Sequence, residues 1–386
     1  MGSSRFHDFG YTVIPVEFRG VECPVVIGHK NFNQIGQAMK LVAETPYLAI
    51  VADARVADLY GAQLLNILEA TGFYVDHLFL PIQNKDKVLK TVERIYRFFT
   101  KIRADWGTTV LLMGGNVLID AAGFASATFC RGLRYVLVPT TLLSQVDGAI
   151  GGAIGVHYRH LTNYIGARRQ PLLVWSDIAM LSTLPEEELR AGMAEVVKQA
   201  VVADAEMFEN LEQYSRFDLR QLEFLEPIIM KTVQVKSRII ERSEEEVCLN
   251  YGHTIGLALE SVLHHQEIRH GEGVAIGMVG EMRIAEQKGI ISTGTRLRLE
   301  ELLHKLNLPV RIPQAIVLRF NSSELLAEKI WRMILRDKKM VAQVLRWVLP
   351  NKIGGYQRAE VEKTLVLNTL MELATEDDFS SPSSST

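Results

Sequence analysis

The sequence predicts an α/β N-terminal domain with a mainly parallel sheet, followed by an all-α C-terminal domain. In the first half, short aliphatic runs alternate with amphipathic segments of helical length, a pattern typical of parallel strands joined by helices. After Pro185 the chain shows long helical periods to about Gly289 and almost no β-rich runs. We expect an α/β domain at residues 1–182, a mainly helical domain at 183–375 and a disordered, serine-rich tail at 376–386.

The elements of the first domain follow from the spacing of their apolar residues. Strands are expected over three aliphatic runs, at 47–52, 75–80 and 108–113. Helices are expected over three segments with helical periodicity, at 56–70, 85–101 and about 121–130. The second domain is expected to open with a helix at Pro185, because proline suits a first turn and the glutamates that follow favour the positive helix end.

Composition and charge exclude several classes of protein. The 386 residues carry a formal net charge of −3, which gives no electrostatic reason to expect nucleic acid or an anionic membrane as partner. No apolar stretch reaches the roughly 18 residues of a membrane helix, and the N-terminus has no secretory signal pattern. Cys23, Cys130 and Cys248 are odd in number and widely spaced, so we expect free thiols and a cytoplasmic location.

Two glycines, Gly114 and Gly115, stand between the third predicted strand and a helix. Such a turn lets backbone N–H groups approach a pyrophosphate at the start of the helix. The run is not GxGxxG, so a tight turn inside a core is the alternative. Asp53 ends an earlier strand, where it would either accept hydrogen bonds from ribose hydroxyls or cap the next helix.

Three glycine-containing segments carry residue types that ligate metals. Glu195 precedes Lys198 by three residues on one predicted helix face, and His253 and His270 each neighbour a glycine. One carboxylate and two imidazoles, with a fourth position open for substrate, form a known catalytic zinc arrangement. The long spacing leaves structural histidines as the alternative, and the pair at 264–265 is interpreted as solvated surface.

The run RGLRYVLVPTTLLSQVD at 131–147 closely resembles the dehydroquinate synthase family of sugar-phosphate cyclases. The resemblance continues through four further segments: LPEEELRAGMAEVVK at 184–198, YGHT at 251–254, HGEGVAIGM at 270–278 and LRDKK at 335–339. It covers about residues 20–370. The chain looks like a divergent member, closer to the cyclitol-forming branches (2-epi-5-epi-valiolone and 2-deoxy-scyllo-inosose synthases) than to dehydroquinate synthase itself.

The resemblance implies that the N-terminal domain binds NAD and that zinc, with cobalt as the alternative, is bound between the domains. It assigns the metal to Glu195, His253 and His270. It implies a set of cofactor-binding residues: Asp53, Lys87, Gly114, Gly115, Asp120, Thr140 and Thr141. It implies a set of catalytic, substrate-lining residues: Asp147, Asn163, Lys198, Lys236, Asn250 and Lys339. A homodimer is implied as well.

The implied activity is NAD- and zinc-dependent cyclisation of a sugar phosphate. It proceeds by transient oxidation, phosphate elimination, re-reduction and intramolecular aldol closure. Departures from the family pattern qualify this expectation. Ala153 and Thr162 stand where the family carries lysines, and Leu257 stands where it carries a second histidine. These losses remove cations and a hydrogen-bond donor from the expected phosphate site. The basic residues of the same stretch would either replace them or form a solvated loop; they are Arg159, His160, Arg168 and Arg169.

Segment 243–249 lacks the arginine that pairs with the substrate carboxylate in shikimate-pathway members. We therefore expect a cyclase of specialised metabolism, such as antibiotic biosynthesis, acting on sedoheptulose 7-phosphate or glucose 6-phosphate. Three alternatives stay open. They are 3-dehydroquinate synthase, an NAD- and metal-dependent redox enzyme acting on a sugar or polyol without phosphate elimination, and a non-catalytic subunit.

Overall fold

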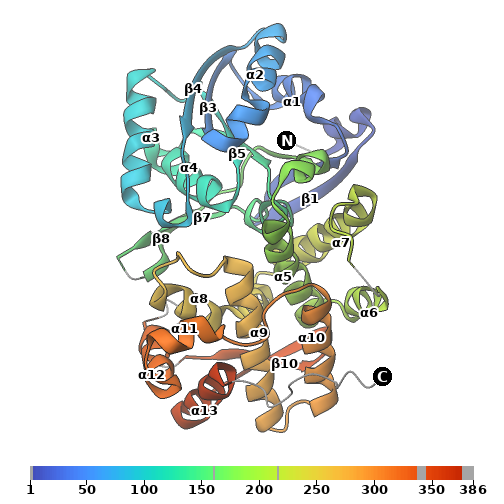
Figure 1. Cartoon of the computed structure of the whole chain (residues 1–386). Coiled ribbons are helices and arrows are strands. Elements are labelled where there is room, and N and C mark those ends of the chain that lie inside the picture. Colours follow the sequence, from blue (N-terminus) through green and yellow to red (C-terminus); the bar gives the residue numbers. More distant parts are fainter. Residues whose placement is uncertain (1–2, 160, 215–216, 337–344, 376–386) are drawn as a thin grey trace, which may run out of the picture.

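The computed structural model describes residues 3–159, 161–214, 217–336 and 345–375. An α/β domain carries the N-terminus, and a helical domain lies against it (Figure 1). His160, Lys339 and the predicted tail at 376–386 lie outside the described residues.

The α/β domain is built on a seven-stranded sheet with the order β1-β2-β9-β6-β5-β3-β4. β1 and β2 pair antiparallel, and every other neighbouring pair in this sheet is parallel. Its strands are β1 (Thr12–Phe18), β2 (Val21–Gly28), β3 (Tyr47–Asp53), β4 (Tyr74–Leu80), β5 (Thr109–Gly114), β6 (Arg134–Pro139) and β9 (Leu173–Asp177). β5 is buried along its whole length, as expected of a central parallel strand covered on both faces.

Helices cover both faces of this sheet. α1 (Ile35–Val42) and α2 (Ala54–Ala70) pack on the face that carries Ile50 and Leu111. α3 (Leu89–Lys101) and α4 (Asn116–Thr128) pack on the opposite face. Within α3, only one side is buried, whereas α4 is buried on nearly all sides because β7 covers it from outside. The carboxyl ends of β3, β5 and β6 therefore meet at one edge, where a doubly wound fold places its ligand.

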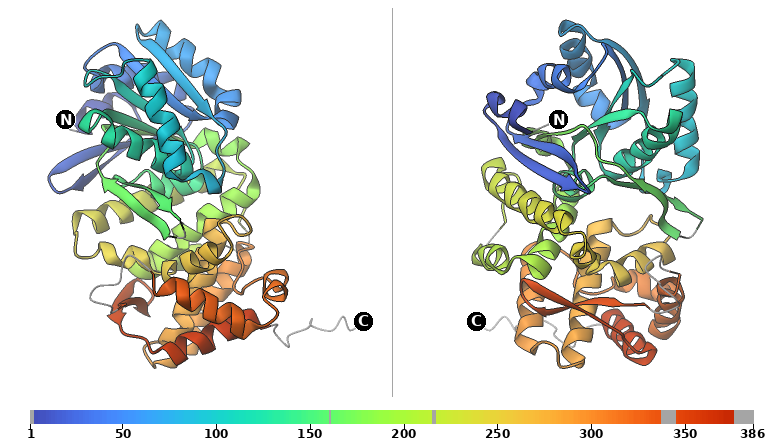
Figure 2. Two further views of the ribbon diagram at one scale, coloured as in Figure 1. Left: turned by 90° about the vertical axis from the view of Figure 1, so that its left-hand side faces the viewer. Right: turned by 180° about the vertical axis from the view of Figure 1, so that it is seen from behind.

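A two-stranded hairpin, β7 (Ala153–Tyr158) and β8 (Leu161–Arg168), runs from the α/β domain toward the helical domain. Its strand β8 contacts α8, which lies beside the hairpin in Figure 1, and Figure 2 shows the chain from two further sides. This hairpin therefore joins the first domain to the second.

The second domain is built around α5 (Glu186–Ala203) and α9 (His270–Gln287), two largely buried helices that pack against each other. The surrounding helices are α6 (Ala205–Gln213), α7 (Leu222–Glu241), α8 (His253–Val262), α10 (Thr293–Lys305), α11 (Gln314–Arg319), α12 (Ser323–Ile334) and α13 (Lys363–Ala374). A hairpin of β10 (Trp347–Lys352) and β11 (Gly355–Ala359) is embedded among them. α7 packs against β1, so one apolar core continues from the sheet into the helices.

The predicted fold class is confirmed, and the expected strands lie where their aliphatic runs placed them. The sequence patterns did not reveal β1, β2, β6, β9 or the two hairpins, and the domain predicted as all-α also contains a short β-hairpin. The predicted domain limits stay a prediction. Among the described helices, none combines the length and the apolar character that crossing a membrane demands.

Two helix boundaries differ from the expectation. The helix expected at 85–101 begins only at Leu89, because Val88 is extended and forms a β-bridge with His157. The helix expected at 121–130 begins at Asn116, directly after the glycine turn, and ends at Thr128. Cys130, which was expected inside it, has a left-handed backbone with φ of 49°.

Candidate functional site

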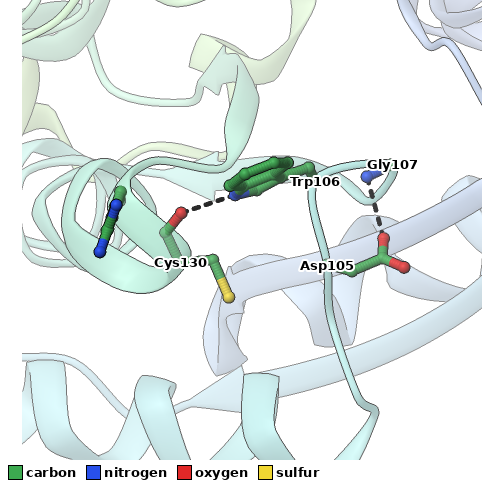
Figure 3. Close-up of a pocket in the computed structure, with 5 residues that line it drawn as sticks. Asp105, Trp106, Gly107 and Cys130 are labelled. Carbon is green, nitrogen blue, oxygen red and sulfur yellow. Dashed lines mark hydrogen bonds between the residues drawn. The ribbon is translucent and has the colours of Figure 1, made fainter.

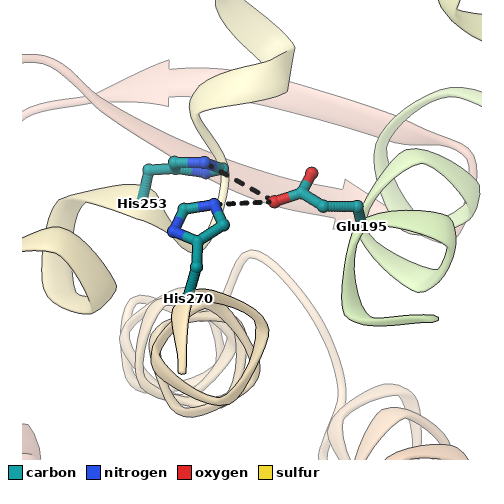
Figure 4. A group of neighbouring side chains, drawn as sticks. All are labelled: Glu195, His253 and His270. Atoms are coloured by element: carbon teal, nitrogen blue, oxygen red, sulfur yellow. Dashed lines mark ion pairs between the residues drawn. The ribbon is translucent and has the colours of Figure 1, made fainter. Parts of the chain in front are cut away.

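Glu195, His253 and His270 converge from three helices of the second domain (Figure 4). Glu195 lies in the buried middle of α5, and the two histidines are the first residues of α8 and α9. The Nε2 atoms of His253 and His270 lie 3.6 and 3.4 Å from Oε1 of Glu195. One ligand atom from each residue falls within 4.8 Å of the others, the separation expected of donors around one cation.

Each histidine is oriented through its other ring nitrogen. Nδ1 of His253 lies 3.2 Å from the carbonyl oxygen of Tyr251, and Nδ1 of His270 lies 2.9 Å from Oε1 of Glu260. Because both neighbours accept hydrogen bonds, the proton of each neutral ring belongs on Nδ1, and Nε2 keeps its lone pair. Metal-bound histidines are held in this way by carboxylates and carbonyls. The donor set therefore fits a zinc-type divalent cation.

The backbone around His253 is shaped by a glycine and a buried carboxylate. Gly252 precedes α8 with φ of 77°, a left-handed conformation that glycine adopts without strain. Glu281 of α9 is fully buried and accepts hydrogen bonds from the N–H groups of Gly252 and Thr254, at 2.8 and 3.1 Å. The first turn of α8 is thereby fixed to α9, and His253 with it.

The charges of the site are balanced by pairing. Burial raises the pKa of Glu195, but Lys198 and the two histidines outweigh it and hold that pKa well below its usual range. Burial lowers the pKa of Lys198, but Glu195 and Asp147 outweigh it, so Lys198 stays charged. Burial raises the pKa of Glu260, yet His270 and His265 bring it to about 2. The site thus offers ionised carboxylates to a cation.

Several predicted substrate-site residues surround this cluster. Lys198 contacts Glu195 one helical turn away on α5. Asp147, in the short turn η5 (Ser144–Gly148), accepts from Nζ of Lys236 of α7 at 2.6 Å. Burial raises the pKa of Asp147, but Lys236 and Lys198 outweigh it and lower the pKa below its usual value. Asn250 ends the short turn η7 (Glu246–Asn250), three residues before His253.

The predicted cofactor residues gather at the carboxyl edge of the sheet. Asp53 ends β3, Gly114 ends β5, and Thr140 follows β6 and donates its N–H to the Gly114 carbonyl at 3.1 Å. Gly115 precedes α4, and Thr141 packs against it. The predicted cofactor glycines thus directly precede a helix N-terminus, the part of a helix that favours anions.

Two cofactor candidates are already engaged within the chain. Lys87 and Asp120 form a largely buried ion pair. Burial nevertheless raises the pKa of Asp120 by more than the Lys87 ammonium lowers it. Asp53 caps α2, accepting from the N–H of Arg55 at 3.0 Å, and also pairs with the Arg55 guanidinium. Asp53 is therefore a helix cap in this structure, and its role in cofactor binding stays a prediction.

The interpretation of His264–His265 as solvated surface is wrong for His265. His264 is exposed, but His265 is half-buried and its ring stacks on His157 with centroids 4.4 Å apart. Sequence reasoning also missed His157, Glu260 and Glu281, whose roles depend on contacts between distant segments. Of these three residues, only Glu260 had a signal in the sequence. It lies in the helical pattern that follows the GHT motif.

The altered phosphate-site positions carry no cation. Ala153 is exposed on β7, and the hydroxyl of Thr162 lies 2.9 Å from that of Ser261. Of the basic residues expected to compensate, Arg168 pairs with Glu246 and Arg169 donates to the Gly132 carbonyl at 3.2 Å. Both guanidinium groups are thus engaged elsewhere.

A separate surface hollow lies at the opposite end of β5 (Figure 3). It is lined by Asp105, Trp106, Gly107, Cys130 and Arg131, and Nε1 of Trp106 donates to the Cys130 carbonyl at 2.7 Å. Asp105 to Gly107 precede β5, whereas Gly114 and Gly115 follow it. The hollow is therefore remote from the predicted cofactor edge.

Comparison with known proteins identifies the family. Models of the 3-dehydroquinate synthase N-terminal and C-terminal regions match residues 77–191 and 192–340. The 3-dehydroquinate synthase of Nostoc punctiforme is 38% identical over 339 residues, covering 86% of this chain and 90% of its own. That of Thermosynechococcus vestitus is 37% identical over 375 residues, covering 94% and 99%.

Solved structures show the same architecture. The 2-epi-5-epi-valiolone synthase of Streptomyces hygroscopicus, with NAD+ and Zn2+ bound, has a TM-score of 0.81 at 26% identity and covers 93% of this chain and 98% of its own. A 2-deoxy-scyllo-inosose synthase with carbaglucose-6-phosphate, NAD+ and Co2+ has a TM-score of 0.80 at 22% identity, covering 94% and 99%, which supports the fold alone.

These comparisons confirm the resemblance at the level of the family. The curated relatives above carry the name of 3-dehydroquinate synthase, so they do not support placing the chain in a cyclitol-forming branch. From the two matching family models and the identity along most of both chains, the protein belongs to the 3-dehydroquinate synthase family.

Proposed function

We propose that the protein is a sugar-phosphate cyclase that uses NAD and a divalent metal ion, and that its substrate lacks a carboxylate. The convergence of Glu195, His253 and His270 next to the Asp147–Lys236 pair carries this proposal. The valiolone synthase structure, which contains NAD+ and Zn2+, supports the choice of both cofactors. A homodimer and a cytoplasmic location stay predictions.

In this proposal the three ligands hold zinc, with cobalt as the alternative, and the carboxyl edge of the sheet holds NAD. When bound, the metal would polarise substrate oxygens and NAD would supply reversible hydride transfer. Lys198 stays protonated, so it can donate a hydrogen bond to an oxygen on which negative charge develops. Asp147 stays ionised and holds the Lys236 ammonium in place, so the substrate meets two fixed cations.

The segment between α7 and α8 argues against a carboxylated substrate. Its residues 243–249 contain no arginine, and their Glu246 is an acid that the Arg168 guanidinium already engages. Arg242, which precedes them, pairs with Glu245. A carboxylate binds best to a free, bidentate guanidinium. We therefore favour sedoheptulose 7-phosphate or glucose 6-phosphate, and a cyclitol precursor of specialised metabolism as the product.

Two other functions have specific support. The 38% identity to a cyanobacterial 3-dehydroquinate synthase favours that activity. The absence of a cation at Ala153, Thr162 and Leu257 favours a redox enzyme that acts on a sugar or polyol without eliminating phosphate. A non-catalytic subunit has less support, because it would not need the paired charges around Glu195.

Phosphate release by the zinc- and NAD-loaded protein tests the proposal. The assay offers sedoheptulose 7-phosphate, glucose 6-phosphate and the carboxylated seven-carbon shikimate precursor in parallel, and mass spectrometry identifies the products. The expected result is release from one of the first two with no net NADH. Release only from the carboxylated substrate would establish 3-dehydroquinate synthase instead. No release from any of them would rule out elimination on these substrates and turn attention to unphosphorylated polyols.

A His253→Ala variant, which removes one proposed metal ligand, serves as the matched control for that assay. It is expected to lose turnover together with metal content. Unchanged metal content and turnover in this variant would show that the metal assignment is wrong.

A further inference from the structure

His157 connects three parts of the molecule whose relative positions matter for the proposed reaction. It lies on β7, where its ring is half-buried between the hairpin and the helical domain. The backbone N–H of His157 donates to the Lys87 carbonyl at 2.8 Å. Its Nδ1 accepts the N–H of Asn163 at 3.0 Å, and its ring stacks on His265 at 4.4 Å with an angle of 6° between the planes.

Each of these contacts leads to a different part of the site. Lys87 pairs with Asp120 on α4 beside the predicted cofactor edge. His265 lies between α8 and α9, with Nδ1 3.7 Å from Oε2 of Glu260. The other oxygen of Glu260 holds Nδ1 of His270, at 2.9 Å. A single residue therefore links the cofactor side, through its backbone, with the hairpin and the support of a proposed metal ligand, through its ring.

The contact to Asn163 fixes an unusual backbone. Asn163 has φ of 50°, in the left-handed region that few residues other than glycine, asparagine and aspartate adopt. The hydrogen bond from its N–H to His157 spans the two strands at that point. One residue earlier, the Thr162 hydroxyl contacts Ser261 of α8. The hairpin is thus held to α8 directly before Asn163, and to the segment after α8 by the stack of His157 on His265.

We propose that His157 is a positioning residue that fixes Asn163 against the metal-binding domain, through the hydrogen bond at Nδ1 and the stack on His265. The role given to Asn163 rests on the proposed function, whereas the fixing of the hairpin does not. The inference assigns His157 no contact with substrate or cofactor.

The protonation state of the ring agrees with this role. Burial, the Lys87 ammonium, His265 and His270 lower the pKa of His157 to about 3, against the opposing charge of Glu260. The ring is therefore neutral near pH 7, and Nδ1 keeps the lone pair that accepts the Asn163 N–H.

The test compares three variants of the full-length protein loaded with zinc and NAD. His157→Phe keeps a planar ring to stack on His265 but removes the acceptor. His157→Gln keeps an acceptor oxygen without the ring. His77→Phe is the matched control, since His77 is exposed on β4 and stacks on Phe79 away from the hairpin. Hydrogen exchange by mass spectrometry follows the 153–168 segment, and steady-state kinetics use whichever substrate the wild-type protein turns over.

In His157→Phe, amides of the hairpin are expected to exchange about fivefold faster, because one hydrogen bond contributes roughly 1 kcal/mol. kcat is expected to fall about fivefold if the same free energy holds Asn163 in place, with KM and zinc content unchanged. His157→Gln should recover part of both losses, and His77→Phe should match the wild type.

Hairpin exchange equal to that of the wild type in His157→Phe would overturn the inference. Hairpin exchange equal to that of the wild type in His157→Gln would also overturn it, because that variant has no ring and the stack on His265 would then have no part. If the wild-type protein turns over none of the sugar phosphates, the proposed function fails, but the exchange measurement still decides the role of His157 in fixing the hairpin.

Discussion

Glu260 can tune the proposed metal site without touching the metal. It is nearly fully buried, and its carboxylate engages Nδ1 of His270 on one side and faces His265 on the other. We expect Glu260→Gln to weaken zinc binding about 10- to 100-fold, because the amide accepts a weaker hydrogen bond and orients His270 less firmly. Competition with a chromophoric chelator measures the affinity.

Glu286→Gln is the matched control for that prediction, because Glu286 lies on α9, the helix that begins with His270, and pairs with Arg296 rather than with a proposed ligand. Equal zinc affinity in the wild type and Glu260→Gln would mean that Glu260 serves only to compensate charge.

Gly252 sets the entry to α8 by its backbone. Its φ is 77°, and a Cβ there would lie 2.8 Å from Cγ of Met278 and 2.9 Å from the Val274 carbonyl oxygen. We expect Gly252→Ala to cost about 1–3 kcal/mol of unfolding free energy and to weaken zinc binding, because His253 follows directly. Urea unfolding and chelator competition measure the two effects.

Gly289→Ala separates backbone strain from side-chain crowding as causes of the stability loss expected for Gly252→Ala. Gly289 has a similar φ of 69°, but a Cβ there would meet no atom within 4 Å. Its substitution should cost about 1 kcal/mol from backbone strain alone and leave zinc affinity intact. If the two variants lose equal stability, crowding at Gly252 has no role.

At the scale of elements, α6 depends on one carboxylate. Asp204 caps it by accepting the Met207 N–H at 3.0 Å, and it also pairs with Lys231 and Arg238 of α7. We expect Asp204→Ala to lower the unfolding free energy by about 1 kcal/mol at pH 7, as loss of a helix cap does. Asp204→Asn should retain most of the cap and lose only the ion pairs.

Asp204 should also make the free energy of unfolding depend on pH, in a direction that follows from its pKa. Burial raises the pKa of Asp204, but the Met207 N–H and the two cations outweigh it, so the folded value lies below the usual 3.8. Its contribution is therefore present above about pH 4 and is lost as the pH falls through the folded pKa. The stability difference between wild type and Asp204→Ala should shrink below pH 4 in urea titrations. A difference that stays constant down to pH 3 would contradict the assignment.

The elements that the sequence predicted share a simple physical origin. β3, β5 and α2 show continuous aliphatic or helical patterns, because a sheet covered on both faces needs apolar residues throughout. β7 and β8 gave no such signal, since β7 has only a short run of buried residues and β8 has no fully buried residue. Periodicity cannot reveal a strand that is buried only in part by contacts with distant segments.

At the scale of the whole molecule, the same distinction separates what could be predicted of the site from what could not. Glu195, His253 and His270 lie in sequence motifs that carry the family resemblance, and the fold brings them together. His157 and Glu281 act through contacts with segments about 100 and 30 residues away, and no local pattern encodes such contacts. Their residue types are also compatible with ordinary surface or helix positions.

The two proposed cofactors should stabilise the molecule independently, because their sites lie in different layers of the fold. Zinc would join α5, α8 and α9, whereas NAD would lie at the carboxyl edge of the sheet. A ligand present at 100 times its Kd adds about 2.7 kcal/mol to the unfolding free energy. We expect each ligand to raise the Tm of the wild-type protein by a few degrees and a chelator to reverse only the zinc effect.

His253→Ala distinguishes the sites in this experiment. It should abolish the shift caused by zinc and keep the shift caused by NAD, which would also show that the α/β domain of the variant is folded. His264→Ala should retain both shifts, because His264 is exposed. Equal zinc shifts in His253→Ala and the wild type would place the metal elsewhere. Loss of both shifts in His253→Ala would instead mean that the histidine holds the two domains together without regard to metal.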